Sequence, residues 1–381
     1  MKIVYCTDSI CYQGGIQKIT IIKANSLANI NGNEVWLIVT DNNLLPIYPL
    51  NPKIHLINLN INYFSDDYKS KFNILKGIIF KRLIHKKRIK SIIDNIKPDV
   101  IISTGTSEKN FIGKLPLKSN PIRIREIHMT KNYRLIAAKT FFQKILAIGG
   151  NLIDYYYNIK FYDKIIVLTE EDKKNWKNFP NITTIPNPLT SPCQESSLCQ
   201  NKKVITAGRL VPQKNFKSLI NAWHTISKKH PDWQLEIWGE GELREELQEQ
   251  IIKLGLENSI LLKGYTNNIQ SEMLNASLFV LTSIFEGFGL VITEAMSCGL
   301  PVVSYACPCG PKDIISEGKD GFLVNINDEI ALANKINLLI ENEELRKQMS
   351  NAAKIKADQY NIENITSMWM HLFTNLQNGK K

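Results

Sequence analysis

Two glutamates, Glu286 and Glu294, stand at the two ends of a glycine-rich stretch with seven residues between them. The apolar run 278–281 predicts a strand before this stretch, and residues 290–298 predict a short helix that ends at a Gly-Leu-Pro stop. Glu286 is then expected at the carboxyl end of a strand, where open α/β sheets bind ligands. Glu294 is expected about one turn into the helix, beside its free amide groups. Two carboxylates beside amide donors suit a ligand with hydroxyl groups and phosphates, such as a sugar nucleotide.

A second loop brings positive charge to the end of another expected strand, 203–207. Gly208 permits close approach of the backbone, Arg209 offers a planar fork of donors, and Lys214 adds a second cation. When a nucleoside diphosphate departs, negative charge develops on its leaving oxygen, and two cations stabilise that charge without a metal. The alternative is an ordinary strand-to-helix loop whose cations are solvated.

Together these loops resemble the nucleotide-sugar site of retaining glycosyltransferases of the GT-B fold, and of glycosyltransferase family 4 in particular. The resemblance rests on the glutamate pair and on the glycine-arginine-leucine order at 208–210 with Lys214. The continuation over 306–324 is similar to a bacterial subset of the family that builds capsule, O-antigen and other lipid-linked or surface glycans. The match is dense over about 200–325 and thin over the first half of the chain.

The resemblance implies a role for each of these residues. Glu294 would hold the ribose hydroxyls and Glu286 the hydroxyls of the donor sugar, while Arg209 and Lys214 would stabilise the departing diphosphate. It implies front-face substitution assisted by the leaving group, with no cofactor and no metal required. The remaining donor-binding residues that it implies are Gly208, Gly264, Tyr265, Ser283, Gly287, Phe288, Gly289 and Leu290.

Tyr265 follows a predicted strand in the second half, and the resemblance places the nucleobase beside its ring. The alternative is a strand-ending turn with a surface tyrosine. Ser283 lies one strand away, and its hydroxyl is expected to join the phosphate network.

The first half of the chain offers further candidates. Gly14 and Gly15 follow the first strand and open a helix, so their amides can reach a phosphate from the other side of a cleft. His128 ends a strand at a position that resembles the family's contact to the transferred sugar, although a lone histidine is more often structural. Glu126 is a neighbouring polar candidate, and alternation along the strand is expected to point it to the opposite face.

Strands and helices alternate along both halves of the chain, which predicts parallel sheets with helices on both faces. The fold class is therefore α/β, and the resemblance specifies GT-B, with two Rossmann-like doubly wound domains facing a central cleft. The expected strands are 2–7, 34–40, 53–58, 100–104, 122–127 and 164–169, then 203–207, 233–238, 259–263, 278–281 and 301–305. The expected helices are 17–31, 216–230, 243–253, 269–276, 290–298 and 362–377.

The proline-rich segment 182–192 is the expected linker between the domains. We expect one domain over 1–185 and another over 186–361, and the resemblance implies that the first is the acceptor-side domain and the second the nucleotide-sugar domain. The resemblance implies that the last helix, within about 362–381, crosses back and packs on the first domain.

The composition, 44% hydrophobic over 381 residues, suits two domains with separate cores. No apolar run reaches about 18 residues, so we expect no transmembrane helix. The amino terminus has the pattern of a buried strand and not of a signal peptide. Seven cysteines without disulfide or zinc spacing favour a reducing cytoplasm. Cys307 and Cys309 suggest a metal pair, but free thiols are favoured because no second pair of ligands is nearby.

The net charge of +11 indicates an anionic partner. Much of it lies in one stretch whose apolar residues recur at helical spacing, which predicts a basic amphipathic helix. Contact with anionic lipid or with a polyprenyl-diphosphate acceptor explains this clustering, and the alternative is a helix packed on its own domain. Nucleic acid is not expected, because no aromatic stacking motif or zinc module accompanies the charges. The cations are Lys69, Lys71, Lys76, Lys81, Arg82, Lys86, Lys87, Arg88 and Lys90.

The function implied is transfer of a hexose or N-acetylhexosamine, with retention, from a UDP-sugar to a glycan or lipid-linked glycan. This would serve surface polysaccharide (capsule, O-antigen) or glycoprotein glycan synthesis, in the cytoplasm and peripherally attached to the inner face of the membrane. A sugar-nucleotide epimerase or a phosphorylase of the same fold is one alternative. Another is a basic membrane- or nucleic-acid-binding protein with an inactive transferase fold. The donor sugar, the acceptor and the linkage stay open.

Overall fold

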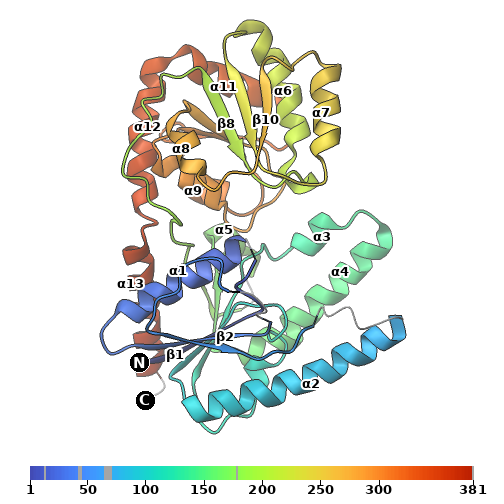
Figure 1. Ribbon diagram of the computed structural model, residues 1–381, viewed down its shortest axis with the longest axis vertical. Coiled ribbons are helices and arrows are strands. Elements are labelled where there is room, and N and C mark those ends of the chain that lie inside the picture. Colours follow the sequence, from blue (N-terminus) through green and yellow to red (C-terminus); the bar gives the residue numbers. More distant parts are fainter. Residues whose placement is uncertain (13, 42–44, 64–70, 177–178, 380–381) are drawn as a thin grey trace.

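The structure, a computed structural model, describes residues 1–12, 14–41, 45–63, 71–176 and 179–379, and for 71–78 and 155–156 it describes the backbone alone. Two parallel sheets, one in each half of the chain, lie one above the other in Figure 1. Along β1 (Lys2–Thr7), Ile3 and Tyr5 pack into one core while Val4 and Cys6 pack into another. Both faces of the first sheet are therefore covered, as parallel sheets require. The predicted α/β fold with two Rossmann-like domains is confirmed.

The first sheet has seven parallel strands in the order β3-β2-β1-β4-β5-β6-β7. After β1 these are β2 (Glu34–Val39), β3 (Ile54–Asn58), β4 (Val100–Ser103), β5 (Ile122–Glu126), β6 (Lys164–Val167) and β7 (Ile182–Thr184). The helices of this half are α1 (Gly15–Asn29), α2 (Lys71–Ile96), α3 (Tyr133–Ala137), α4 (Phe141–Ile153) and α5 (Glu170–Asn175). A π-helical turn, Asp154–Asn158, continues α4.

The second sheet has six parallel strands in the order β10-β9-β8-β11-β12-β13. They are β8 (Lys203–Ala207), β9 (Gln234–Trp238), β10 (Ile260–Gly264), β11 (Leu278–Leu281), β12 (Val302–Tyr305) and β13 (Gly321–Val324). The helices are α6 (Phe216–Lys229), α7 (Arg244–Lys253), α8 (Ile269–Leu274), α9 (Leu290–Ser297), α10 (Pro311–Ile314), α11 (Glu329–Glu341) and α12 (Glu343–Asp358).

Each sheet has a point at which its strand order reverses, between β1 and β4 in the first sheet and between β8 and β11 in the second. Parallel sheets form a ligand-binding crevice at such a point, at the carboxyl ends of the strands. The loop after β1 leads to Gly14 and Gly15, and the loop after β8 carries Gly208 to Lys214. Both reversal points therefore lie beside loops that the sequence identified.

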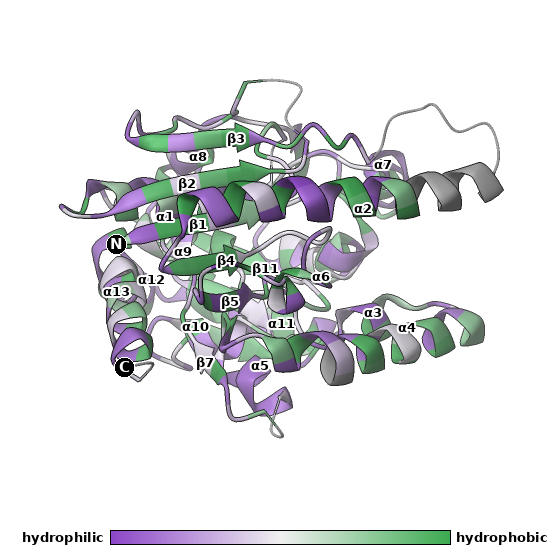
Figure 2. Cartoon of the chain, turned by 90° about the horizontal axis from the view of Figure 1, so that it is seen from below, coloured by the Kyte–Doolittle hydropathy of each residue, from purple (hydrophilic) through white to green (hydrophobic). Residues whose placement is uncertain are grey.

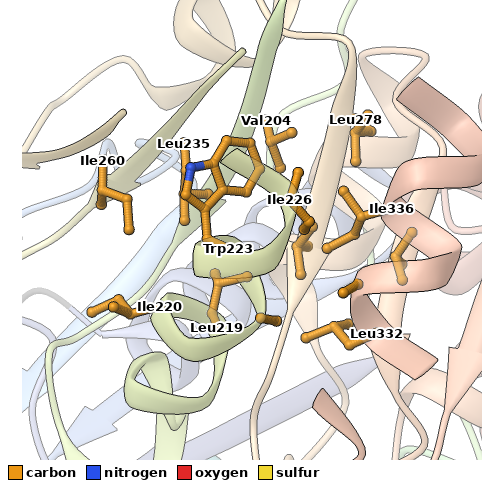
Figure 3. Packing of buried hydrophobic residues seen from close by; sticks show 14 of the residues in the cluster. Val204, Leu219, Ile220, Trp223, Ile226, Leu235, Ile260, Leu278, Leu332 and Ile336 are labelled. Atoms are coloured by element: carbon orange, nitrogen blue, oxygen red, sulfur yellow. The ribbon is translucent and has the colours of Figure 1, made fainter. Parts of the chain in front are cut away.

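Helix α6 holds the loop after β8 in place because its apolar stripe is buried against the second sheet (Figure 3). Trp223 is fully buried in this core, with Leu332 and Ile336 of α11 in the same cluster. Replacing a buried tryptophan of this kind with alanine costs about 3–5 kcal/mol. The stripe, at the spacing of one helical face, consists of Leu219, Ile220, Trp223 and Ile226.

The final helix, α13 (Ile362–Asn378), follows α12 of the second domain but packs beside α1 of the first (Figure 1). Trp369 and Phe373 are buried in the core of the first domain. The hydroxyl groups of Ser26 and Thr366 lie 2.7 Å apart and join α1 to α13. The chain thus crosses between the domains twice, once near residue 190 and once near residue 360.

Several elements were not predicted from the sequence. Helices α3, α4 and α5 lie in a region where no helix was expected, and β7 occupies the start of the expected linker 182–192. Strand β7 has only three residues, too few for a readable alternation. Helix α4 has its large apolar side chains on one broad arc, but this arc faces outward and not toward the sheet.

The expected basic helix is α2, which has 26 residues. Lys69 lies outside the described residues, and the side chains of Lys71 and Lys76 also lie outside them. Among the helices that the structure describes, none combines the length and the apolar character needed to cross a bilayer.

Candidate functional site

Three loops of the second domain meet through glycines at the carboxyl ends of β8, β9 and β10. The Gly208 amide donates to the Trp238 carbonyl at 2.9 Å, and the Gly239 amide donates to the Gly264 carbonyl at 2.8 Å. Gly239 has a φ of +136°, and a Cβ at this position would overlap the carbonyl oxygen of Gly208. Since only glycine permits this conformation and this approach, the loops form a continuous backbone surface at the sheet edge.

The side chain of Lys214 crosses this surface and reaches the loop after β11. A Cβ at Gly208 would lie 3.1 Å from Lys214 Cε, so the absence of a side chain there leaves room for the lysine. The Lys214 ammonium lies 2.6 Å from Glu286 Oε1, and the hydroxyl of Ser283 donates to the same oxygen at 2.6 Å. Arg209 is exposed at the start of the loop. The structure thus brings together a lysine, a serine and a glutamate that the sequence had singled out separately.

Two hydrogen bonds to backbone carbonyls join the two loops that carry this cluster. The side-chain amide of Gln213 donates to the Phe285 carbonyl at 2.8 Å, and the Ile284 amide donates to the Gln213 carbonyl at 2.9 Å. The Lys214 and Glu286 side chains are only 16% and 10% exposed. Partial burial strengthens their attraction relative to that of a surface pair, so the cluster has a defined geometry before any ligand arrives.

Glu294, the second glutamate, lies in α9, which begins after Gly289 in a left-handed conformation at φ +95°. Its carboxylate accepts a hydrogen bond from the Thr190 hydroxyl. The ammonium of Lys18, from α1 of the first domain, lies 3.7 Å from the same carboxylate oxygen and donates to Thr190 Oγ1 at 3.0 Å. The two glutamates therefore have different cations beside them, one from their own domain and one from the opposite domain.

The two domains touch where Gly287 meets His128. A Cβ at Gly287 would overlap the His128 carbonyl oxygen, so a glycine is required for this contact. A Cβ at Gly15 would lie 3.2 Å from Leu290 Cδ1, which places the start of α1 against the start of α9. Phe288 turns its ring into the core, where it is buried, so only its backbone is available at the site.

His128 is buried, with its Nε2 atom 3.4 Å from Glu126 Oε1. The expectation that Glu126 points to the opposite face is wrong, because residues two apart along an extended chain share a face. Burial lowers the pKa of His128 to about 4, although the Glu126 carboxylate raises it. Burial alone raises the pKa of Glu126, but the ammonium of Lys23, paired with it, produces a net lowering. At neutral pH the site therefore contains a neutral imidazole beside a charged carboxylate–ammonium pair.

Tyr48 is a residue of this site that sequence reasoning missed. Burial raises the pKa of its phenol, with further contributions from Tyr265 and Glu294, and the Gly14 backbone hydrogen-bonds to its hydroxyl group. It thus lies between the first helix and the second domain. Tyr265 is 57% exposed, and its hydroxyl donates to Asn267 Oδ1 at 2.8 Å. Tyr48 lies in a proline-rich loop that contains no recognisable motif, so no local sequence signal identifies it.

A cavity of about 120 Å³ adjoins His128 on the first-domain side. Asp154, at the start of the π-helical turn, lies in it between two cations: Lys109 at 3.0 Å and Arg134 at 2.8 Å. None of these three residues was predicted as a site residue. Residues lining the cavity include Ile16, Lys109, Arg125, His128, Arg134 and Asp154.

Among the described residues, no group of three or more His, Cys, Asp or Glu side chains is arranged to hold a metal ion. Cys307 and Cys309 are buried, and burial raises the pKa of both thiols, that of Cys309 to about 12. The Cys309 thiol donates to Thr130 Oγ1 at 3.1 Å. These are protonated thiols in a packed environment.

The cations of α2 do not all face solvent. Arg82, Lys86, Lys87 and Arg88 are exposed, whereas Lys81 and Lys90 are partly buried. Arg88 donates to the Leu59 and Asn60 carbonyls, and Lys90 pairs with Asp94. The helix therefore packs on its own domain through part of its surface, with a subset of its cations available to a partner.

Comparison with known proteins gives a consistent pattern. The family described as "Glycosyl transferases group 1" matches residues 194–356. An uncharacterized glycosyltransferase of Haemophilus influenzae is 29% identical over 97% of this chain and 98% of its own length. One from Methanocaldococcus jannaschii is 30% identical over 76% of this chain and 82% of its own. The amylovoran biosynthesis glycosyltransferase AmsD of Erwinia amylovora is 26% identical over 97% and 98% of the two chains.

Two solved structures share the fold. A TarM variant of S. aureus, solved with fondaparinux, alpha-GlcNAc-glycerol and UDP, superposes with a TM-score of 0.75 at 17% identity, over 98% of this chain and 99% of its own. The lipopolysaccharide outer core galactosyltransferase WaaB superposes with a TM-score of 0.73 at 18% identity, over 98% and 100%. Both support the two-domain GT-B architecture.

Proposed function

Because this chain belongs to the group 1 glycosyltransferases, we propose that it transfers a hexose or an N-acetylhexosamine from a UDP-sugar with retention of anomeric configuration, as a member of family 4. The observation that carries this proposal is the cluster of Lys214, Ser283 and Glu286 at the carboxyl edge of the second sheet. It lies beside the contact between Gly287 and His128, so a sugar held there would face both domains.

The donor site in this proposal extends from β10 to α9. Tyr265 stacks beside the base, Glu294 takes the ribose hydroxyls, and the amides at the start of α9 take the phosphates. Lys18 and Thr190 contact the Glu294 carboxylate in the structure, so the ribose hydroxyls would replace these contacts. The UDP in the solved TarM complex is compatible with a uridine donor for this fold.

In the proposed reaction, the bond between the anomeric carbon and the diphosphate oxygen breaks while the acceptor hydroxyl adds from the same face. The hydroxyl proton passes to the departing phosphate oxygen. Arg209 and Lys214 stabilise the charge that develops on the diphosphate, so the proposal requires no metal and no cofactor. The ion pair with Lys214 also orients Glu286 toward the sugar hydroxyls. The neutral imidazole of His128 offers a hydrogen-bonding partner that carries no charge at neutral pH.

The acceptor in this proposal approaches from the first domain, through the cavity beside His128. Lys109 and Arg134 supply positive charge for an acceptor diphosphate, and Asp154 supplies a carboxylate for acceptor hydroxyls. The name of the relative AmsD supports a surface polysaccharide, of the capsule or O-antigen type, as the product. A polyprenyl-diphosphate-linked glycan fits both the charge of the cavity and that class of product.

We place the enzyme in the cytoplasm, attached peripherally to the inner face of the membrane through the exposed cations of α2, and we expect no nucleic-acid partner. Arg82, Lys86 and Lys87 are the cations of this helix that support the attachment.

The deciding experiment incubates the purified protein with a panel of sugar nucleotides and a lipid-diphosphate acceptor, and identifies products by mass spectrometry. We expect one glycosyl unit on the acceptor and one UDP released per transfer, unchanged by a metal chelator. Proton NMR of the new linkage should show the anomeric configuration of the donor. Inversion of that configuration would overturn the retaining assignment.

The same assay separates the alternatives. An epimerase would convert the sugar nucleotide without consuming acceptor, and a phosphorylase would transfer from a sugar phosphate without releasing UDP. A protein with an inactive transferase fold would neither bind UDP in calorimetry nor turn over any donor.

A further inference from the structure

Helix α4 (Phe141–Ile153) exposes an apolar face that no described residue of the chain covers. At 100° per residue, its large apolar side chains lie within one broad arc, while Gln143, Ala147 and Asn151 lie on the other side. Ala147 is its only buried residue, and Asn151 lines the cavity beside His128. The helix therefore turns its polar and small side toward the protein and its apolar side outward, the reverse of a normal surface helix.

The exposure is large at each position. Phe141 is 80% exposed and Phe142 is 68% exposed, at the end of the helix farthest from the sheet. Isolated exposed apolar residues are ordinary, but a contiguous group marks a surface that binds something. The exposed apolar residues of α4 are Phe141, Phe142, Ile145, Leu146, Ile148, Leu152 and Ile153, and α3 adds Leu135 and Ile136.

The acidic and basic residues of the segment 127–153 are all of one sign. From 127 to 153 the sequence contains no aspartate or glutamate, whereas Lys139 and Lys144 are exposed at the start of α4. Helix α2 projects from the same side of the first domain, as both views show (Figures 1 and 2). It exposes Phe80 and Leu83 beside its own cations. The ammonium of Lys114 lies over the Tyr157 ring, in the segment after α4. Burial lowers the pKa of Lys114, and the positive charges of Lys86 and Arg82 lower it further, so α2 lies near this segment.

We propose that the α3–α4 hairpin (residues 133–153) inserts the apolar face of α4 into the headgroup and acyl boundary of an anionic phospholipid bilayer. At 13 residues α4 is about 20 Å long. This is too short to span a bilayer, which needs about 20 residues, but it suits a helix that lies in the interface. Positive charge on the same side as the apolar residues matches an anionic lipid surface, and a soluble protein partner would not require it.

The consequence concerns access to the cavity. Asn151 and Asp154, at the end of α4, line the cavity beside His128. Insertion of α4 would hold this cavity at the membrane surface, within reach of an acceptor whose lipid chain stays in the bilayer. This deepens the membrane attachment proposed above, and it moves the main contact from charge on α2 to apolar side chains on α4.

The test is vesicle co-sedimentation of the full chain. The probe vesicles contain phosphatidylcholine with about one third phosphatidylglycerol, at 0.1 M and 1 M NaCl. Salt at 1 M reduces the Debye length to about 3 Å and removes the contribution of α2. We expect the wild type to keep measurable binding at 1 M NaCl. The triple variant Phe141→Gln, Phe142→Gln, Leu146→Gln should lose roughly 100-fold or more of that residual partitioning.

A matched control variant removes three equally exposed apolar residues from the second domain: Leu198→Gln, Ile330→Gln and Ile355→Gln. It should bind like the wild type. Because all six positions are exposed, both variants should unfold at the temperature of the wild type, which separates lost insertion from lost folding. The Gln143–Thr140 cap of α4 is unchanged in the test variant.

Two results would overturn the proposal. One is that 1 M NaCl releases the wild type from the vesicles as completely as it releases the test variant. The membrane contact would then be electrostatic alone. The other is a wild-type dimer in sedimentation equilibrium that is absent in the test variant, combined with vesicle binding of the variant equal to that of the wild type. In that case α4 would bind a second copy of the chain and not lipid. Sedimentation uses no donor or acceptor, so either failure leaves the proposed transfer reaction untouched.

Discussion

The ammonium of Lys214 and the carboxylate of Glu286 form a 2.6 Å ion pair that joins the loop after β8 to the loop after β11. Each residue comes from a separate sequence motif, and the two are 72 positions apart. The pair places a positive charge where a diphosphate is expected and orients a carboxylate toward the expected sugar.

Removing either cation of the loop after β8 should slow transfer without unfolding the protein. Arg209→Ala and Lys214→Ala should each cost about 2–4 kcal/mol of transition-state stabilisation, roughly 30- to 1,000-fold in kcat/KM. Lys217→Ala is the control, because Lys217 forms an exposed pair with Glu246 outside the site and should change little. Steady-state kinetics with the donor identified above measures this. Near-normal turnover in both site variants would rule out the diphosphate assignment.

The two glutamates should differ in what they bind. Glu294→Gln should weaken the binding of free UDP, because Glu294 is expected to contact ribose. Glu286→Gln should leave UDP binding nearly unchanged and lower the rate with intact donor, because Glu286 is expected to contact the sugar. Calorimetry with free UDP on both variants separates the roles. Equal losses of affinity would show that the division is wrong.

Gly287→Ala should force the domains apart. The added Cβ would overlap the backbone oxygen of His128, which has no flexible side chain to move away. Overpacking of this kind costs about 1–3 kcal/mol, and here a rotation between the domains relieves it. Small-angle X-ray scattering should show a larger radius of gyration, and turnover should fall. The control is Gly149→Ala in α4, where a Cβ meets nothing within 4 Å. An unchanged scattering curve for Gly287→Ala would contradict the contact.

His128 should stay neutral until the solution is well below pH 6. Its pKa is lowered to about 4 by burial, so NMR of labelled histidine should show no titration of this ring near 6.5. Between pH 6.5 and 4 the unfolded chain binds the proton that folded His128 does not. The free energy of unfolding therefore falls as the pH drops through this range.

The variant His128→Gln should lack this contribution, which is about 3 kcal/mol at most for a shift of this size. The difference in free energy of unfolding between the variant and the wild type, measured by denaturant titration at pH 7 and pH 4.5, checks it. A difference that does not change with pH would show that His128 titrates normally.

The exposed cations of α2 should contribute an electrostatic part of vesicle binding. Arg82→Gln, Lys86→Gln and Lys87→Gln together should weaken binding to anionic vesicles at low salt, since each cation near such a surface is worth about 1 kcal/mol. Arg88 is left in place because it donates to the carbonyls of Leu59 and Asn60.

The matched control for α2 is Lys202→Gln, Lys217→Gln and Lys253→Gln, which removes the same charge from exposed positions of the second domain. Turnover on a short, water-soluble acceptor should survive in both triple variants. If the two bind anionic vesicles equally, net charge alone and not the α2 surface determines the attraction.

Local pattern in the sequence was sufficient for most of the framework. Apart from β7 and β13, the strands of both sheets were predicted, because fully buried parallel strands are short apolar runs bounded by turn residues. The loops after β8 and β11 were identified because each combines glycine with charged residues at the carboxyl end of such a run. Those signals depend only on neighbours along the chain.

Other features have no such signal. The three residues of β7 are too few to show alternation, and the outward direction of the apolar face of α4 is set by packing and not by the spacing of its residues in the sequence. Tyr48 and the cavity residues Lys109, Arg134 and Asp154 stand alone in sequence. They became candidates only because the fold brings them beside the contact between the domains.

The sequence by itself determined that this chain forms two parallel-sheet domains with glycine-rich, charged loops at their strand ends. The tertiary structure decided which of those loops meet. Two contacts join residues more than 100 positions apart: that of His128 with Gly287 and that of Lys18 with Glu294. A third, between Glu126 and His128, depends on how the end of a strand packs. The physical reason is that hydrophobic periodicity acts between near neighbours, whereas charge pairing and close backbone approach depend on distances in space that only the packed domains define.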